Sequence, residues 1–366
     1  MESLLAQLCE QVKEADATGR SVIVCGGRTK NFYGATRLHD EPGDYMVLDM
    51  SGYAGIVNYE PSELVITARA GTLLSDIEKA LDERGQMLAF EPPRLGPGST
   101  LGGCIAAGLS GPRRMAAGSV RDFVLGSRLL DSSGKVLRFG GEVMKNVAGY
   151  DVSRLLAGSM GIFGVMTEIS LKVSPQPLSE ATVEFAMSQK RALERFNLWR
   201  CQPLPISATA WVARDGGVDG RLSVRFSGNP AAVSQAIQRL GGEVADDAKA
   251  QEFWSSLRDQ THSFFTARPL WRVAVPPTVA ALEQGSTLIE WGGGQRWVTG
   301  VESARELRST VTRAGGHAAL FRYDSAPEGV PVFQPLPVAL HALSRRLKLQ
   351  LDPAGLFNPK RLFPDF

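Results

Sequence analysis

Two glycine-rich segments carry the residues whose types and spacing suit ligand binding. The first is Gly26-Gly27-Arg28-Thr29-Lys30-Asn31, which directly follows an apolar run. Successive flexible residues after a strand can aim a concave array of backbone N–H groups at phosphate oxygens. Arg28, Lys30 and the Thr29 hydroxyl would add further donors. A plain β-turn is the alternative interpretation of this segment.

The second segment extends from residue 96 to residue 168 and is dense in glycine. Each glycine inside a regular element costs about 0.5–1 kcal/mol relative to alanine, so the density needs a reason, and close approach of backbone to a ligand supplies one. Ser99 or Thr100 can cap a short helix through Ala107, whose free N–H groups and positive dipole end would suit a pyrophosphate. The alternative is a small-residue helix packed tightly on a sheet.

Together the two segments favour a dinucleotide held at its middle. The chain has no GxGxxG after a predicted strand, so the Rossmann fingerprint is absent. The spacing does not say which dinucleotide would bind.

Hydrophobic periodicity predicts the elements that position these segments. Thr72 is expected to cap a helix that ends at Gly85. Residues 174–177, Ser-Pro-Gln-Pro, are typical of a linker, and we place a domain boundary there. Before it, we predict helices at 3–16, 73–84 and 99–107 and strands at 21–25, 45–49, 56–59, 64–70, 124–130, 136–139 and 162–173. After it, we predict strands at 182–187, 206–213, 221–227, 270–275, 287–291, 295–301 and 318–323 and helices at 189–199, 229–240, 248–264, 302–314 and 338–350, an α+β order with an antiparallel sheet.

Composition excludes several classes of function. The net charge is +2, which gives no electrostatic case for nucleic-acid binding. The four cysteines, Cys9, Cys25, Cys104 and Cys201, are scattered without a CxxC pair, so neither a disulfide framework nor an iron–sulfur or zinc site is indicated. The N-terminal residues lack the pattern of a signal peptide, and no apolar run approaches the ~20 residues of a membrane span. We therefore expect a cytoplasmic protein that meets a membrane only through partners.

A series of short motifs adds a resemblance to this interpretation. GPRR, GSVRD, KNVAGYD and GSMGIFGVMTE occur in this order between residues 111 and 168, and DPAGLFNP follows near the end of the chain. This series resembles the FAD-binding domain of the vanillyl-alcohol oxidase and p-cresol methylhydroxylase (PCMH) superfamily. The resemblance implies an α+β fold: a PCMH-type FAD-binding domain of two subdomains plus an α+β cap domain with an antiparallel sheet. We expect the FAD-binding domain at 1–174, the cap at 175–335 and a C-terminal segment, 336–366, that returns to the FAD domain.

KNVAGYD and the short length narrow the resemblance to the E-type FAD-binding subunits of bacterial glycolate oxidase complexes. It implies a D-type flavin subunit and an F-type iron–sulfur subunit as partners, oxidation of glycolate to glyoxylate, and electrons passed on to quinone, with the complex peripheral on the inner membrane. A stand-alone FAD-dependent 2-hydroxy-acid or alcohol oxidoreductase, and a non-catalytic assembly subunit, remain the alternatives.

The resemblance also implies which residues hold the cofactor. Two glycine loops would bind the pyrophosphate, and backbone further along would line the adenosine and flavin. The implied residues are Gly26, Gly27, Arg28, Thr29, Asn31, Gly98, Ser99, Thr100, Gly102, Gly103, Gly108, Gly118, Asp122, Lys145, Asn146, Tyr150, Gly164, Val165 and Asn358. Relatives with covalent flavin commonly have a histidine in the first loop; here the position is occupied by Thr29 or a neighbour, so we expect non-covalent FAD.

Catalytic residues are not identified by the sequence. A cation at Lys145 near the N1/C2 edge would stabilise reduced flavin, whereas a surface loop charge is the plain alternative. Arg322 could clamp a carboxylate, or form a surface ion pair. Larger relatives carry HxGxGxxH in the cap; here only His317 is kept, so we expect no metal site and a structural histidine.

Overall fold

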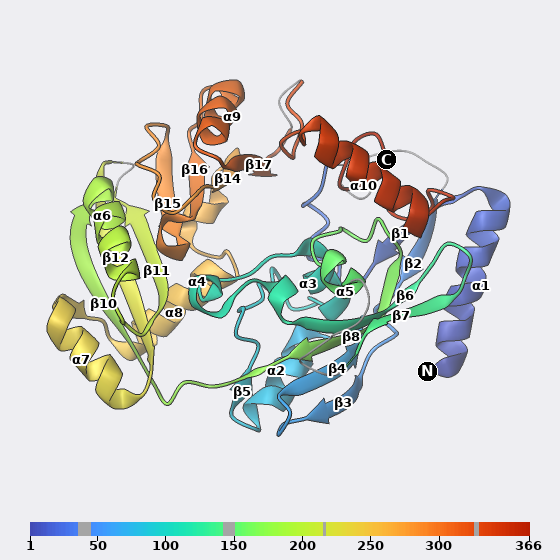
Figure 1. The fold of residues 1–366 in the computed structure, drawn as a ribbon, viewed down its shortest axis with the longest axis horizontal. Helices are drawn as coiled ribbons and strands as arrows, with labels where there is room; N and C mark the ends of the chain where they lie inside the picture. Colours follow the sequence, from blue (N-terminus) through green and yellow to red (C-terminus); the bar gives the residue numbers. More distant parts are fainter. Residues whose placement is uncertain (36–44, 142–150, 215–216, 326–328) are drawn as a thin grey trace. The chain divides into compact units, whose positions relative to one another are not determined.

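The computed structural model describes residues 1–35, 45–141, 151–214, 217–325 and 329–366. Its contacts divide the chain into two units. The first contains residues 1–109, 119–175 and 335–366, and the second contains residues 110–118 and 176–334. Figure 1 shows the elements of both units, and each unit is described by itself. The three domains expected from the sequence stay our proposal for the domain organisation.

The first unit is built on a five-stranded sheet in the order β3-β4-β8-β6-β7, in which all pairs are antiparallel. Its central strand β8 is buried at seven of eight positions, because α3 packs on it and strands flank it on both sides. β1 and β2 form a separate parallel pair, and β5 pairs with β9. The strands are β1 (Ser21–Cys25), β2 (Tyr45–Asp49), β3 (Ile56–Glu60), β4 (Val65–Arg69), β5 (Gln86–Met87), β6 (Val124–Leu130), β7 (Val136–Gly140), β8 (Val165–Lys172) and β9 (Ser174–Pro175).

The helices of this unit are α1 (Glu2–Thr18), α2 (Leu74–Asp82), α3 (Leu101–Ala107), α5 (Val152–Leu155), α10 (Val338–Leu351) and the 3₁₀ turn η1 (Val120–Asp122). Three details of the prediction are wrong. The Thr72 hydroxyl does not cap α2, because it bonds both backbone groups of Gly55. The strand expected from residue 162 begins at Val165, after Gly164 at φ 146°. Ser174 and Pro175 form β9 rather than a free linker.

The second unit is built on an eight-stranded sheet in the order β13-β10-β12-β11-β15-β16-β14-β17, and every pair is antiparallel. The predicted α+β arrangement with an antiparallel sheet is therefore confirmed. The strands are β10 (Ser179–Ser188), β11 (Ile206–Ala213), β12 (Asp219–Gly228), β13 (Glu243–Val244), β14 (Leu270–Ala274), β15 (Ser286–Glu290), β16 (Gln295–Thr299) and β17 (His317–Arg322).

Helices cover this sheet through two apolar clusters. α6 and α7 pack on the face of β10 to β12 that carries Trp211 and Phe226, and α9 packs on β14 and β17. The helices are α4 (Arg114–Ala117), α6 (Gln189–Arg200), α7 (Pro230–Leu240), α8 (Asp247–Arg258) and α9 (Ala304–Arg313), with 3₁₀ turns η2 (Ser263–Thr266) and η3 (Trp291–Gly293). The helix predicted to reach Phe264 ends at Arg258, because Gln260 adopts a left-handed φ of 56°.

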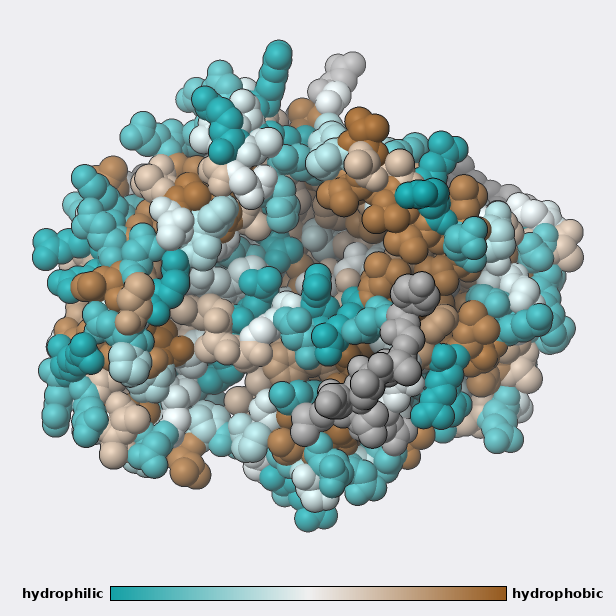
Figure 2. All heavy atoms as spheres, viewed as in Figure 1, coloured by the Kyte–Doolittle hydropathy of each residue, from teal (hydrophilic) through white to brown (hydrophobic). Residues whose placement is uncertain are grey.

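The last helix, α10, exposes apolar side chains. Val338, Leu340, Leu343 and Leu349 are each about half or more exposed, and Figure 2 shows hydrophobic side chains gathered over this helix. Lys348, in contrast, is buried. Within the described residues, no helix combines the length and apolar character needed to cross a membrane.

Lys348 forms a buried ion pair that anchors the end of the chain. Its ammonium lies 2.6 Å from a carboxylate oxygen of Asp352 and also donates to the carbonyls of Ile162 and Phe357. Asp352 accepts the N–H groups of Leu356 and Phe357, so all partners of the carboxylate are internal. Burial lowers the pKa of Lys348, while Asp352 acts in the opposite direction. The pair therefore fixes the turn that sends residues 353–361 back toward β1.

Replacing one member of this pair should destabilise the first unit. Asp352→Ala leaves a buried ammonium without its counter-charge, which costs about 3–5 kcal/mol of unfolding free energy. The double variant Lys348→Met/Asp352→Leu should recover part of the loss, since no uncompensated charge remains although four backbone groups lose their partners. Urea unfolding of the three proteins measures the difference. Equal stability of Asp352→Ala and the wild type would contradict the role given to the pair.

Candidate functional site

The loop that follows β1 presents a run of unpaired backbone donors. Within the described residues, the N–H groups of Gly26, Gly27, Arg28 and Thr29 make no hydrogen bond, whereas Asn31 N–H bonds the Arg28 carbonyl at 3.3 Å. Arg28 adopts a left-handed φ of 58°, which bends the loop so that successive N–H groups point to one side. Such an array attracts the oxygens of a phosphate.

Two cations accompany this loop. The Arg28 guanidinium lies 3.7 Å from the Asp49 carboxylate, and both side chains are about half exposed. The Lys30 ammonium donates to the Ser99 hydroxyl at 2.6 Å and to Thr29 Oγ1 at 3.3 Å. Positive charge and N–H donors therefore occupy the same loop.

The first glycine loop packs backbone to backbone against the second. A Cβ on Gly27 would lie 1.4 Å from the Gly98 carbonyl oxygen, and one on Gly26 would lie 2.4 Å from Thr100 Oγ1. The close approach that glycine permits is here an approach of one loop to the other. Gly98, Ser99 and Thr100 therefore support the first loop from behind.

One prediction about α3 is wrong. Its first-turn donors are used inside the protein: Leu101 N–H bonds Thr72 O and Gly102 N–H bonds Ala70 O, both at 2.8 Å. Gly103 N–H bonds its cap, Thr100 Oγ1, at 3.4 Å. The helix has only seven residues and lies against the end of β4, so its start offers no free donors to a phosphate. The packed small-residue helix, the alternative interpretation, describes α3.

The chain end closes the site from a third direction. Asn358 Oδ1 accepts the Val24 N–H at 2.8 Å, and its Nδ2 donates to the Met160 carbonyl at 2.7 Å. Arg361 donates to the carbonyls of Lys30 and Asn31, each at 3.1 Å. Asn358 thus links β1 to the loop before β8. Arg361 binds carbonyls of the loop that follows β1, so the N–H groups of that loop face the other way.

Two small adjoining hollows, each of about 80 Å³, lie among these elements. Burial raises the pKa of Cys25, which lines both, although Arg28 opposes the shift. Burial likewise raises the pKa of Cys104 to about 12, so this thiol of α3 is neutral. The first hollow is lined by residues 24–31, Thr100, Gly103, Ala106, Ala107, Met160, Asn358 and Arg361; the second adds Met50, Ala70, Gly102, Gly161, Gly164 and Met166.

The remaining implied cofactor residues have varied positions. Gly108 ends α3 with a left-handed φ of 66°, and a Cβ on it would lie 2.7 Å from the Gly158 Cα. Val165 is buried and is the first residue of β8. Asp122 accepts both the N–H and the hydroxyl of Ser119 in a capping box. Burial acts to raise the pKa of Asp122, but these bonds lower it overall. Gly118 lies in the second unit, and Lys145, Asn146 and Tyr150 lie outside the described residues.

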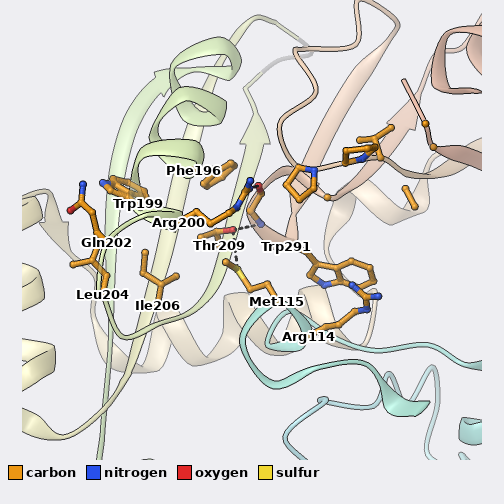
Figure 3. Close-up of a pocket in the computed structure, with 18 of the residues that line it drawn as sticks. Arg114, Met115, Phe196, Trp199, Arg200, Gln202, Leu204, Ile206, Thr209 and Trp291 are labelled. Carbon is orange, nitrogen blue, oxygen red and sulfur yellow. Dashed lines mark hydrogen bonds between the residues drawn. The ribbon is translucent and has the colours of Figure 1, made fainter. Parts of the chain in front are cut away.

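The second unit contains a cavity of about 670 Å³ with a positively charged lining (Figure 3). Arg114, Arg200 and His317 line it, and no aspartate or glutamate is among its described lining residues. The Arg114 guanidinium stacks 4.4 Å from the Trp291 ring centre, and Arg200 donates to the Gly292 carbonyl at 2.9 Å. An anion with a flat or apolar part suits such a lining.

The two weak catalytic candidates of this unit differ in position. His317 lines the cavity and keeps solvent contact, yet desolvation and the charge of Arg272 lower its pKa. Arg322 does not line the cavity and donates to Gln260 Oε1 at 3.0 Å. Burial lowers the pKa of Arg322 to about 10. No cluster of three or more possible metal ligands occurs within the described residues.

Comparisons with known proteins agree with this geometry. A family model described as FAD binding domain matches residues 5–140. The chain is 43% identical over 360 residues to glycolate oxidase subunit GlcE of Escherichia coli (strain K12), an alignment that covers 98% of this chain and 97% of that protein. The chain belongs to the glycolate oxidase subunit GlcE family.

More distant relatives share parts of the chain. Glycolate oxidase subunit GlcD of Bacillus subtilis (strain 168) is 33% identical over 164 residues, which are 45% of this chain and 34% of that protein. A solved structure of alkyldihydroxyacetonephosphate synthase superposes with a TM-score of 0.65 at 16% identity, covering 97% of this chain and 75% of that one. The structural likeness shows the fold alone. The predicted family and the FAD-binding, oxidoreductase class are confirmed.

Sequence reasoning missed several residues around this candidate site. Cys25, Ala106 and Met160 line the hollows, and Arg361 braces the loop. Arg361 follows the recognised DPAGLFNP segment by two residues, which was the one available signal. Met160 has a left-handed φ of 54°, a feature invisible in its residue type.

The loop contact predicts very different effects for two glycine substitutions. Gly27→Ala places a methyl group 1.4 Å from a carbonyl oxygen. Overpacking against backbone should lower the unfolding free energy of the apoprotein by about 3 kcal/mol or more. Gly103→Ala, whose Cβ meets only Thr100 Oγ1 at 3.3 Å, should stay within about 1 kcal/mol of the wild type because alanine favours the helix. Thermal unfolding of both variants tests this; similar melting temperatures would refute the contact.

Proposed function

We propose that this chain is an FAD-binding subunit of a multisubunit complex that oxidises glycolate to glyoxylate. The observation that carries the proposal is the run of four unpaired N–H groups from Gly26 to Thr29, beside Arg28 and Lys30. Membership in the GlcE family is the basis for proposing glycolate as the substrate and a complex as the assembly, since the Escherichia coli relative is named a subunit of glycolate oxidase. In this proposal the first role of the chain is to bind the pyrophosphate of FAD.

In this proposal the pyrophosphate lies on the Gly26–Thr29 loop. Its negative charge meets the N–H array, with Arg28 and Lys30 as further donors. Arg361 and Asn358 position the loop and do not touch the phosphates. Gly102, Gly103 and Gly164, which line the second hollow, would let the cofactor pass close to backbone.

We propose that FAD is bound without a covalent link. The Cys104 thiol is buried and neutral, which makes it a poor nucleophile toward a flavin carbon. The described part of the first loop contains no histidine. The bound flavin would supply a two-electron acceptor for a CH–OH donor. Lys145, Asn146 and Tyr150 remain proposed neighbours of the flavin.

The partners proposed are a D-type flavin subunit and an F-type iron–sulfur subunit. An iron–sulfur cluster is usually held by four cysteine thiolates, and the four cysteines of this chain are far apart in sequence. Electrons that leave the flavin would therefore pass to a partner and then toward quinone. We propose a cytoplasmic complex that is peripheral on the inner membrane through those partners.

A self-contained 2-hydroxy-acid oxidoreductase is the second candidate, and the cationic cavity favours it. Arg114 and Arg200 would hold a carboxylate, and His317, with its lowered pKa, is neutral at pH 7 and able to accept a proton. A non-catalytic assembly subunit is the third possibility, with FAD kept for structure.

Removing the loop cations should weaken FAD binding. Arg28→Met and Lys30→Met should each raise the dissociation constant of FAD about tenfold or more, because a hydrogen bond to a charged group is lost. Arg138→Met, an exposed arginine of β7, is the matched control and should bind as the wild type does. Fluorescence titration of apoprotein measures the constants.

Acid precipitation should leave a colourless pellet and a yellow supernatant, because FAD is bound without a covalent link. A yellow pellet would refute non-covalent binding.

Anaerobic glycolate separates the candidate functions. We expect glycolate to bleach the flavin absorbance only when the D- and F-type subunits are present. Bleaching of the isolated chain would favour the self-contained enzyme. In that case the rate should fall as the pH drops through the lowered pKa of His317, below the ordinary value, because protonation removes the base. His317→Asn should then abolish this pH dependence.

A further inference from the structure

The last helix, α10, and the residues just before it expose a concentration of apolar side chains. Five large ones within residues 336–349 are exposed: Leu336, Val338, Leu340, Leu343 and Leu349. Val338 keeps 87% of its surface exposed, and only Lys348 of the helix is buried. Single exposed leucines are normal on a protein surface, whereas a group of them on one element is typical of an interaction site.

The exposed positions follow the periodicity of a helix that docks on another surface. Four of them lie along one side of α10, at intervals of four, three and four residues: Val338, Ala342, Arg345 and Leu349. Lys348 lies on another side, where its ammonium bonds the Ile162 carbonyl and so faces the first unit. Apolar anchors at this spacing are what an amphipathic helix offers to an apolar groove of a partner protein.

Contacts near both ends of α10 hold its exposed side in one position. Near the start, His341 Nε2 lies 3.1 Å from a carboxylate oxygen of Asp365, and the His341 ring packs edge-on against Phe366 with 5.5 Å between ring centres. Near the end, Lys348 pairs with Asp352 at 2.6 Å. A helix that is already fixed loses little conformational entropy when a partner binds it. The exposed side is therefore a preorganised surface.

The charges that α10 exposes are positive. The helix contains no aspartate or glutamate. Its exposed cations are Arg345 and Arg346, and neither guanidinium forms an ion pair within the described residues. A surface that meets α10 therefore needs carboxylates beside its apolar contacts. A second copy of this chain, related by a two-fold axis through α10, would bring arginine against arginine and does not fit.

An anionic lipid surface fits these residues less well than a protein does. Basic segments that bind such a surface carry clusters of about 4–8 lysines and arginines, whereas α10 exposes only Arg345 and Arg346. Leu340 and Leu343 are also exposed beside the side that carries Val338. Apolar side chains on more than one side of a helix suit a groove that encloses the helix better than a flat interface.

We propose that α10 is the docking helix of this chain for another subunit of its complex. The partner holds α10 in an apolar groove, and aspartate or glutamate residues at the border of the groove pair with Arg345 and Arg346. The inference rests on the proposed function in one respect, that the chain works as a subunit.

Truncating the exposed apolar side chains should weaken the complex and leave the chain itself intact. In the complex with the D- and F-type subunits, Val338→Ser and Leu349→Ser should each raise the apparent dissociation constant about tenfold. Val218→Ser and Leu198→Ser replace an exposed valine and an exposed leucine of the second unit, and these controls should leave the constant unchanged. Mass photometry of the purified complex on dilution measures the constant. The melting temperature and FAD affinity of each isolated variant should equal those of the wild type.

Charge reversal tests the acidic border of the groove. Arg345→Glu/Arg346→Glu should slow association with the partner subunits about tenfold at low salt. Added NaCl should slow association of the wild type, because it screens the attraction. Arg138→Glu, at an exposed arginine of β7, is the matched control and should associate as the wild type does. Surface plasmon resonance with immobilised D- and F-type subunits measures the rates.

Three results would overturn the inference. Assembly of the α10 variants at the wild-type level would contradict the inference alone. Failure of the wild-type chain to join the D- and F-type subunits would contradict the proposed function as well. Binding of the full chain to phosphatidylglycerol vesicles that Val338→Ser or Leu349→Ser abolishes, while the complex stays intact, would assign α10 to a lipid surface instead.

Discussion

The contact of Gly27 with the Gly98 carbonyl is the constraint on which the cofactor-binding half of this protein depends. With no Cβ on either residue, two loops separated by some seventy positions lie backbone against backbone. The first loop is then supported by the second, and the N–H groups of Gly26 to Thr29 are not needed for internal bonds. The glycines therefore act indirectly. They allow one loop to pack on the other, and the donors from Gly26 to Thr29 stay available for a phosphate. A side chain at Gly27 would separate the loops and also disturb the direction of those donors.

The far end of the sequence completes the same site by buried polar contacts. The Lys348–Asp352 pair fixes the turn after α10, and Asn358 then spans from Val24 to Met160. A buried ion pair of this kind adds little net stability, because desolvation offsets its attraction. The pair instead selects one conformation of the chain end, because the ammonium is fully hydrogen-bonded only when Ile162 and Phe357 present their carbonyls. The position of Arg361 over the loop carbonyls follows from this anchoring, so the cofactor loop depends on residues more than three hundred positions away.

Local signals in the sequence predicted the regular elements well and the polar contacts poorly. β11 was predicted at its observed bounds, 206–213, because an apolar run ends there at clear turn signals. Ser99 or Thr100 was predicted as the cap of α3, because their hydroxyls precede a run of small residues, and the cap is Thr100. The free donors expected at the start of α3 were wrong, because only the fold places Ala70 and Thr72 against them. The bonds of Arg296 could not be predicted for the same reason: the carbonyls of Val279 and Ala280 meet its guanidinium only in the folded sheet.

The connection between β14 and β15 relates the two cavities of the second unit. Pro276 and Pro277 line the cationic cavity, whereas residues 278–285 line a second cavity of about 860 Å³. Arg296 donates to the carbonyls of Val279 and Ala280, just past the point where the segment passes from one cavity to the other. Gly293, without a Cβ, leaves room for the Pro277 carbonyl. A shift of this segment would break the bonds of a fully buried guanidinium and leave its charge unpaired. Helix α6 also reaches both cavities, since Phe196 lines the first and Leu193 lines the second. The connecting segment is therefore expected to stay fixed when a ligand enters either cavity, and α6 is the element that can move with both.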